Sequence, residues 1–131
     1  MEVSINKIAY NVFEPYPNGE TISVSINAKF GASKEDYSIR AFFLELNIDG
    51  EDAENGDETR NFALVARLNY QIDKNLFPNI DENEMAEDGG YFHEFLKRIN
   101  EIVVNITSQD DIRRPLDIDQ AIENHKSTKG E

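Results

Sequence analysis

Carboxylates are the side chains of this sequence that are most able to do chemistry, and they gather in segments with few apolar residues. The chain has 26 Asp and Glu against 13 Lys and Arg, which gives a net charge of −13. Six of the acids lie between Asp49 and Arg60, and more follow between Asp73 and Gly90. Acidic segments of this kind first suggest a calcium loop.

The spacing of these acids excludes an EF-hand. That loop needs Gly at position 6, oxygen ligands at positions 1, 3 and 5, and Glu at position 12. Placing Gly56 at position 6 puts Ala53 at position 3 and Phe62 at position 12. Placing Gly89 there puts Phe95 at position 12. We therefore expect solvated loops and no metal or other cofactor.

Other catalytic motifs are also missing from the sequence. His93 and His125 are isolated from one another, there is no cysteine, and no serine has a G-x-S-x-G context. Neither Gly-rich phosphate-binding pattern occurs. We expect a protein that is not an enzyme. A hydrolase or isomerase using paired carboxylates is the least favoured alternative, because no Asp or Glu pair differs from its neighbours.

The charge and the length of the apolar runs restrict the partners. An acidic chain repels phosphate backbones and anionic lipids, so we expect no nucleic acid and no membrane partner. No apolar run approaches 18 residues, and the first ten residues lack the basic and apolar parts of a secretory signal. We expect a cytoplasmic protein.

One amphipathic helix organises the chain. Residues 91–107 predict it, because large apolar residues recur with helical spacing while polar residues take the other side. The apolar stripe consists of Phe92, Phe95, Leu96, Ile99, Ile102, Val103 and Ile106. Such a helix needs an apolar surface to cover.

Four strand-like segments precede this helix and supply that surface. They span residues 3–13, 21–30, 37–48 and 61–72, and apolar residues alternate along them. In the first segment the alternation changes phase near Asn6–Lys7, which predicts a β-bulge. Strands followed by a helix predict an α+β fold, with a four-stranded antiparallel meander covered on one face. We expect a single domain over residues 1–124 and a disordered tail over residues 125–131.

The third and fourth strands carry apolar residues on both faces, more than one helix can cover. We expect a second copy of the chain to bury the surplus, which predicts a homo-oligomer, either a dimer or a tetramer. The residues predicted to form its interface are Phe42, Leu44, Leu46, Ala63 and Val65.

Apolar residues in the segment 76–85 belong to no periodic element. They suit either a lid over the edge of the sheet or a groove for extended polypeptide, formed near residues 76–85 and the strand edges. Apolar contact together with backbone pairing would make such a groove tolerant of many sequences. The residues predicted to contact the peptide are Leu76, Phe77, Ile80, Met85, Ile118 and Ile122.

The order of these elements resembles the export chaperone SecB. In both, four strands, a crossover, a long helix and a turn lead to a last helix. Here that helix begins at Pro115-Leu116-Asp117-Ile118-Asp119-Gln120-Ala121-Ile122, which is similar to the Pro-Val-Asn-Phe-Asp-Ala-Leu segment of SecB. Over nearly its full length the chain also resembles a family of small, acidic, uncharacterised proteins of Gram-positive cocci, itself placed in the SecB-like fold.

The resemblance implies an oligomeric protein without enzymatic activity that holds unfolded polypeptide, as SecB holds preproteins for the export ATPase SecA. The alternative function is an interaction adaptor, in which the acidic loops dock a basic protein. Salt distinguishes the two, because docking through exposed charges weakens as ionic strength rises whereas binding in an apolar groove persists.

Overall fold

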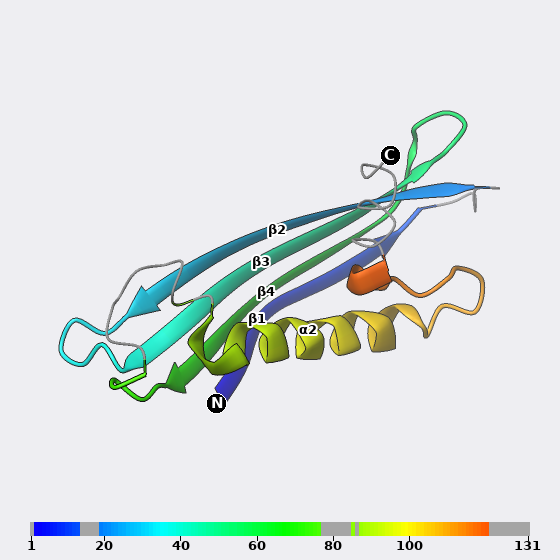
Figure 1. The fold of residues 1–131 in the computed structure, drawn as a ribbon. Coiled ribbons are helices and arrows are strands. Elements are labelled where there is room, and N and C mark those ends of the chain that lie inside the picture. Colours follow the sequence, from blue (N-terminus) through cyan, green and yellow to red (C-terminus); the bar gives the residue numbers. More distant parts are fainter. Residues whose placement is uncertain (1, 14–18, 77–84, 86, 121–131) are drawn as a thin grey trace, which may run out of the picture.

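The fold is a four-stranded sheet with one long helix on one face (Figure 1). The computed structural model describes residues 2–13, 19–76, 85 and 87–120. Its elements are β1 (Glu2–Val12), β2 (Glu20–Ala32), β3 (Ile39–Asp52), β4 (Glu58–Gln71), the 3-10 turn η1 (Asp88–Gly90) and α2 (Tyr91–Thr107). A short helical turn follows at residues 118–120. The predicted α+β class is confirmed, and α2 has the predicted bounds. The tail predicted at residues 125–131 lies outside the described residues.

The order of the strands differs from the predicted meander. The sheet runs β1-β4-β3-β2, and every neighbouring pair is antiparallel. The hairpin between β2 and β3 is confirmed, but β1 pairs with β4 instead of β2. Three consecutive strands joined as hairpins, with the remaining strand beside the far one, form a Greek key. Both β1 and β2 are therefore edge strands.

The predicted bulge in β1 is confirmed. Ile5 lies opposite Ala66, Lys7 lies opposite Val65, and the register shifts between them at Asn6. Residues directly opposite one another in antiparallel strands point to the same face of the sheet. The extra residue therefore keeps Ile5 and the following Ile8 on the same face, the one that α2 covers.

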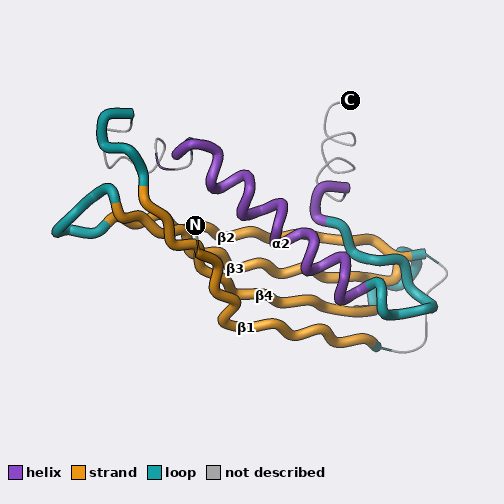
Figure 2. Tube along the Cα trace, turned by 90° about the horizontal axis from the view of Figure 1, so that it is seen from below, coloured by secondary structure: helices purple, strands orange, loops and turns teal. Residues whose placement is uncertain are grey.

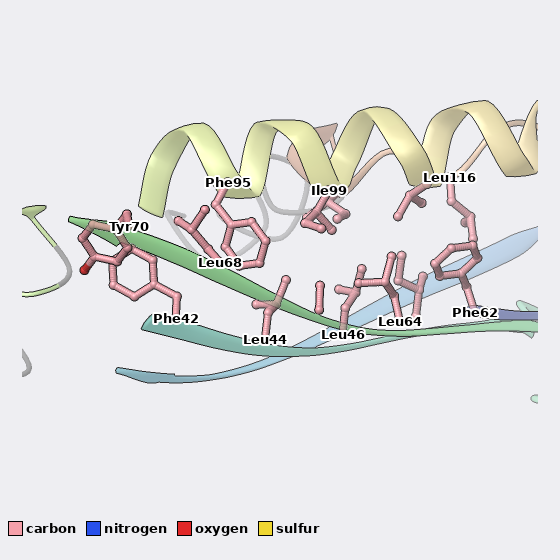
Figure 3. Close-up of a cluster of buried hydrophobic side chains, with 14 of the residues drawn as sticks. Phe42, Leu44, Leu46, Phe62, Leu64, Leu68, Tyr70, Phe95, Ile99 and Leu116 are labelled. Carbon is pink, nitrogen blue, oxygen red and sulfur yellow. The ribbon is translucent and has the colours of Figure 1, made fainter. Parts of the chain in front are cut away.

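The core lies between α2 and the two central strands. Phe95, Ile99 and Val103 of the helix are fully buried. Phe95 and Ile99 point toward the sheet (Figure 3). The helix crosses the sheet diagonally (Figure 2). The sheet side of the core consists of Phe42, Leu44, Leu46 and Ile48 on β3 and of Phe62, Leu64, Ala66, Leu68 and Tyr70 on β4. At about 1.5–3 kcal/mol per buried side chain, this layer is the largest stabilising feature of the fold.

Polar side chains of α2 hold the segment that follows the helix. Asn100 accepts a hydrogen bond from the amide of Ile118 at 2.7 Å, and the Thr107 hydroxyl accepts one from the amide of Leu116 at 2.8 Å. The Asp117 carboxylate accepts a bond from the amide of Gln120 at 3.1 Å, as a helix N-cap does. These bonds fix Leu116 and Ile118 against the core, where both are buried.

Three of the residues predicted to form an oligomer interface lie inside this core. Phe42, Leu44 and Leu46 are at most 1% exposed within the single chain, so they are not available to a second copy. The two faces of β3 are both apolar in sequence, and the register with β4 decides which of them meets the helix. Because Phe42 lies opposite Leu68, it faces α2. Ala63 and Val65 lie on the opposite face and are partly exposed.

Truncating the centre of the helix stripe should destabilise the whole fold. Ile99→Ala removes a fully buried side chain and is expected to lower the free energy of unfolding by about 2–5 kcal/mol, measured by urea denaturation. The matched control is Ile112→Ala, because Ile112 is 66% exposed and should change stability by less than about 0.5 kcal/mol. Equal effects of the two substitutions would contradict the helix-on-sheet core.

Candidate functional site

Those predicted peptide-contacting residues that the structure describes do not come together as one surface. Leu76 is 71% exposed, whereas Met85 and Ile118 are each 4% exposed and belong to the core. The core covers both of these side chains, and their assignment as peptide contacts stays a prediction. Phe77, Ile80 and Ile122 lie outside the described residues.

Edge strand β1 carries an exposed apolar row on the helix side of the sheet, which we name the β1 strip. It consists of Ile5, Ile8 and Val12, which are 37%, 41% and 37% exposed. Their partners on β4 are Ala66, Leu64 and Arg60, all of which are buried under the helix layer. The strip is therefore continuous with the core, but α2 does not cover it.

Other side chains of β1 on the same face do reach the core. Val3 and Tyr10 are half-buried and pack against it, and the Tyr10 ring lies 5.9 Å from the Phe62 ring. The strip thus lies along the border of the helix–sheet layer, with one edge of the β1 backbone unpaired by any strand of the described sheet.

A buried arginine fixes the end of the strip where β1 finishes. Arg60 is 2% exposed and donates to both carboxylate oxygens of Glu20 at 2.7 and 3.0 Å. It also donates to the Tyr10 hydroxyl at 3.1 Å and to the backbone carbonyl of Arg114 at 2.9 Å. One guanidinium thereby joins β4 to β1, to β2 and to the segment after α2. Burial opposes the charge of Arg60, but the bonds to Glu20 and Tyr10 outweigh it and raise the pKa of the guanidinium.

A glycine makes room for this cluster. Gly50 lies opposite Arg60 on β3, and a Cβ there would meet Oε2 of Glu20 at 2.5 Å and Oγ1 of Thr59 at 2.6 Å. Any side chain at position 50 would therefore displace the carboxylate that pairs with Arg60.

A second buried ion pair holds the start of the helix to the sheet. Arg40 on β3 donates from Nη1 to both carboxylate oxygens of Asp88, at 2.6 and 2.7 Å, and neither side chain is exposed. The Tyr70 hydroxyl donates to the same carboxylate at 2.6 Å. Burial and the bond to Asp88 raise the pKa of Tyr70 well above its usual range, so the phenol remains a donor. Gly89 and Gly90, both at positive φ, follow directly and lead the chain into α2.

These clusters are suited to holding the fold together, and they show no catalytic arrangement. Among the described residues, no group of three or more His, Cys, Asp or Glu could hold a metal ion. Within the same residues, no helix is long and apolar enough to cross a membrane.

Comparison with known proteins identifies the fold. The chain is similar to the Mycobacterium tuberculosis Rv1957 SecB-like chaperone, solved in complex with a ChAD peptide from the Rv1956 HigA1 antitoxin. The TM-score is 0.68 at 14% sequence identity, over 90% of this chain and 86% of that one. The fold is SecB-like, as the sequence resemblance implied.

The sequence itself gives no further match. No model of a known protein family matches the chain, and no curated protein does so. The resemblance to a family of Gram-positive cocci therefore stays a prediction.

The β1 strip was not predicted as a site, although the sequence contains the pattern that places its residues on one face. The phase change at Asn6–Lys7 implied that Ile5, Ile8 and Val12 share one face. Their exposure depends on the diagonal path of α2 and on the edge position of β1, and neither of these is encoded locally.

Breaking the buried ion pair at the start of α2 should lower the free energy of unfolding more than breaking an exposed ion pair. Arg40→Met leaves the Asp88 carboxylate buried without its cation and is expected to lower the free energy of unfolding by about 3–5 kcal/mol. The control is Lys74→Met, which removes a pair with Asp36 whose side chains are 50% and 37% exposed, and should cost less than about 1 kcal/mol.

The double substitution Arg40→Met with Asp88→Asn tests the reason for this cost. It removes the charge that Arg40→Met leaves unpaired, so part of the lost stability should return in urea or thermal denaturation. A double variant less stable than Arg40→Met would show that the buried charge is not the cause.

Proposed function

We propose that this protein binds unfolded or extended polypeptide along the β1 strip. The observation that carries the proposal is the row formed by Ile5, Ile8 and Val12, which is exposed beside the core on an edge strand. An edge strand offers unpaired backbone groups, and the apolar row offers contacts for alternate side chains of a bound chain. Recognition of this kind depends little on the exact sequence of the client.

The charge distribution is consistent with holding clients reversibly. The strip is apolar, while the chain around it is strongly acidic, which opposes self-association through exposed edges. The bulge at Asn6 divides β1 into two short pairing segments, so a bound chain can form only limited regular pairing with either. Both features favour temporary holding over incorporation into a growing sheet.

The SecB-like fold supports the proposal. The mycobacterial chaperone of this fold was solved with a peptide bound, so the architecture is compatible with peptide binding. This support is at the level of the fold, and the residues proposed here come from the exposure and register of this chain alone.

The binding test substitutes residues of the β1 strip and leaves the core residues unchanged. In the double variant Ile5→Ser/Ile8→Ser, affinity for a labelled, reduced and unfolded protein should fall about tenfold or more, because two partly exposed aliphatic contacts are lost. Fluorescence anisotropy measures the affinity, and light scattering measures whether aggregation of the client is suppressed at equimolar ratio. Ile112→Ser serves as the control, because it also removes an exposed isoleucine, outside the strip.

The outcomes separate the alternatives. Wild-type protein that neither suppresses aggregation nor binds an apolar dye such as ANS would remove the proposal. Binding that is unchanged in the double variant and is lost at high salt would instead favour docking of a basic partner by the acidic loops.

A further inference from the structure

A hollow lies on the face of the sheet opposite α2, which no described element covers (Figure 1). Its volume is about 250 Å³, and it is lined mainly by residues of β2, β3 and β4. Gly31 and Ala41, which lie directly opposite one another on β2 and β3, form the small-residue part of its lining. Ile39 and Phe43 stand on either side of Ala41 on the same face and are 50% and 41% exposed. The hollow therefore has a large apolar side chain at each end and small residues between them.

Gly31 leaves this space open without being required by the backbone. Among the described glycines, positive φ occurs at Gly56, Gly89 and Gly90. A Cβ added at Gly31 would meet one side chain within 4 Å, the Phe43 ring, at the ordinary contact distance of 3.8 Å. Glycine inside a strand lowers stability and often marks a place that a ligand approaches closely. The fold would accept a side chain here, so the open space itself is what Gly31 contributes.

Two exposed cations flank the Phe43 ring. Lys29 lies opposite Phe43 on β2, and Arg67 lies opposite it on β4. The Arg67 guanidinium lies 4.8 Å from the centre of the ring, and its Nε donates to Oδ1 of Asn69 at 2.8 Å. Within the described part of the chain no ion pair involves either cation, although the sequence has 26 acids. Both cations are therefore available to an anion from outside the chain.

The acids that are nearest by register lie outside the hollow. Glu45 is in the row of β3 beyond Phe43, and Glu2 lies opposite Asn69 on edge strand β1. Neither residue lines the hollow, whereas Arg67 and Asn69 both do. The β4 side of the hollow thus presents a cation and an amide, which favours an anionic ligand over a cationic one.

We propose that this hollow binds a small aromatic carboxylate. Its volume lies below the roughly 300–1,000 Å³ of pockets for drug-sized ligands, so the ligand is limited to about one ring. A flat ring packs against Phe43 as aromatic pairs do and fills the space over Gly31 and Ala41. The carboxylate pairs with Arg67, whose planar guanidinium matches two carboxylate oxygens, and Lys29 adds a second positive charge.

The test titrates the chain, labelled with nitrogen-15, with benzoate at low ionic strength and follows its NMR signals. The dissociation constant should be on the order of 1 mM. The backbone amides of Gly31 and Ala41 and the side-chain signals of Arg67 and Asn69 should shift. Benzamide keeps the ring without the charge, and acetate keeps the charge without the ring. Each of these should bind at least about tenfold more weakly than benzoate.

Two substitutions separate the charge from the space. Arg67→Met removes the cation and should weaken benzoate binding about tenfold or more. Gly31→Val fills the hollow with a residue that suits a strand, so it should abolish binding while urea denaturation shows that the fold is retained. The matched control is Lys7→Met, which removes a cation of the same face in the row of Val65, outside the hollow, and should leave the affinity unchanged.

Several results would overturn the proposal. One is the absence of any shift up to about 20 mM benzoate. Another is equal weakening by Arg67→Met and Lys7→Met, which would make the effect one of general surface charge. Benzamide that binds as well as benzoate, or shifts confined to α2 or the β1 strip, would also contradict it. The hollow and the β1 strip lie on opposite faces of the sheet, so failure here leaves the proposed binding of polypeptide standing.

Discussion

The structure depends on the burial of one sheet face beneath one helix stripe. Phe95, Ile99 and Val103 are fully buried against β3 and β4, and the packing of this layer sets the position of everything around it. A single helix is narrower than a four-stranded sheet, so it cannot cover both edges of the face on which it lies. The apolar row on β1 is one part of the helix-side face that remains accessible, and Ile26 on β2, the other edge strand, is 36% exposed on the same face. The candidate site is thus a direct consequence of how the core is built.

Two buried arginines help to fix the positions of α2 and β1, which apolar packing alone would not determine. Arg40 binds the carboxylate that immediately precedes α2, and Arg60 joins both edge strands to the segment after the helix. Buried ion pairs add little net stability, because desolvation offsets much of their attraction. Their clearer effect here is on position, since mismatched placement of the helix or of β1 would leave a charge buried without a partner. Rigid placement of β1 in turn keeps the apolar row exposed beside the core.

The sequence predicted the elements well because their signals are local. Periodicity placed α2 at residues 91–107 and the bulge at Asn6, and both agree with the structure. The strand order was not predictable in this way, because the pairing of β1 with β4 depends on contacts far apart in the chain. The orientation of β3 was ambiguous for a related reason. Both of its faces are apolar, and only its register with β4 turns Phe42 toward the helix.

The candidate site was harder to predict than the fold. Met85 appeared as an apolar residue outside the periodic elements and Ile118 as part of the weak apolar face of the last helix. Both were assigned to a groove, yet both complete the core. Asn100 of α2 draws Ile118 inward through a hydrogen bond to its amide, and nothing in the local pattern of residues 115–120 reveals that bond. Conversely, β1 looked like an ordinary strand, and its exposed row became a site only through its place at the edge of the sheet.

Amide hydrogen exchange, with and without an unfolded client, tests most directly whether a polypeptide binds at the uncovered border of the helix–sheet layer. The account predicts that a bound client slows exchange within residues 2–12 of β1 and leaves exchange on β2, the other edge, largely unchanged. A client that slows exchange on β2 or along α2 while β1 remains unaffected would contradict it.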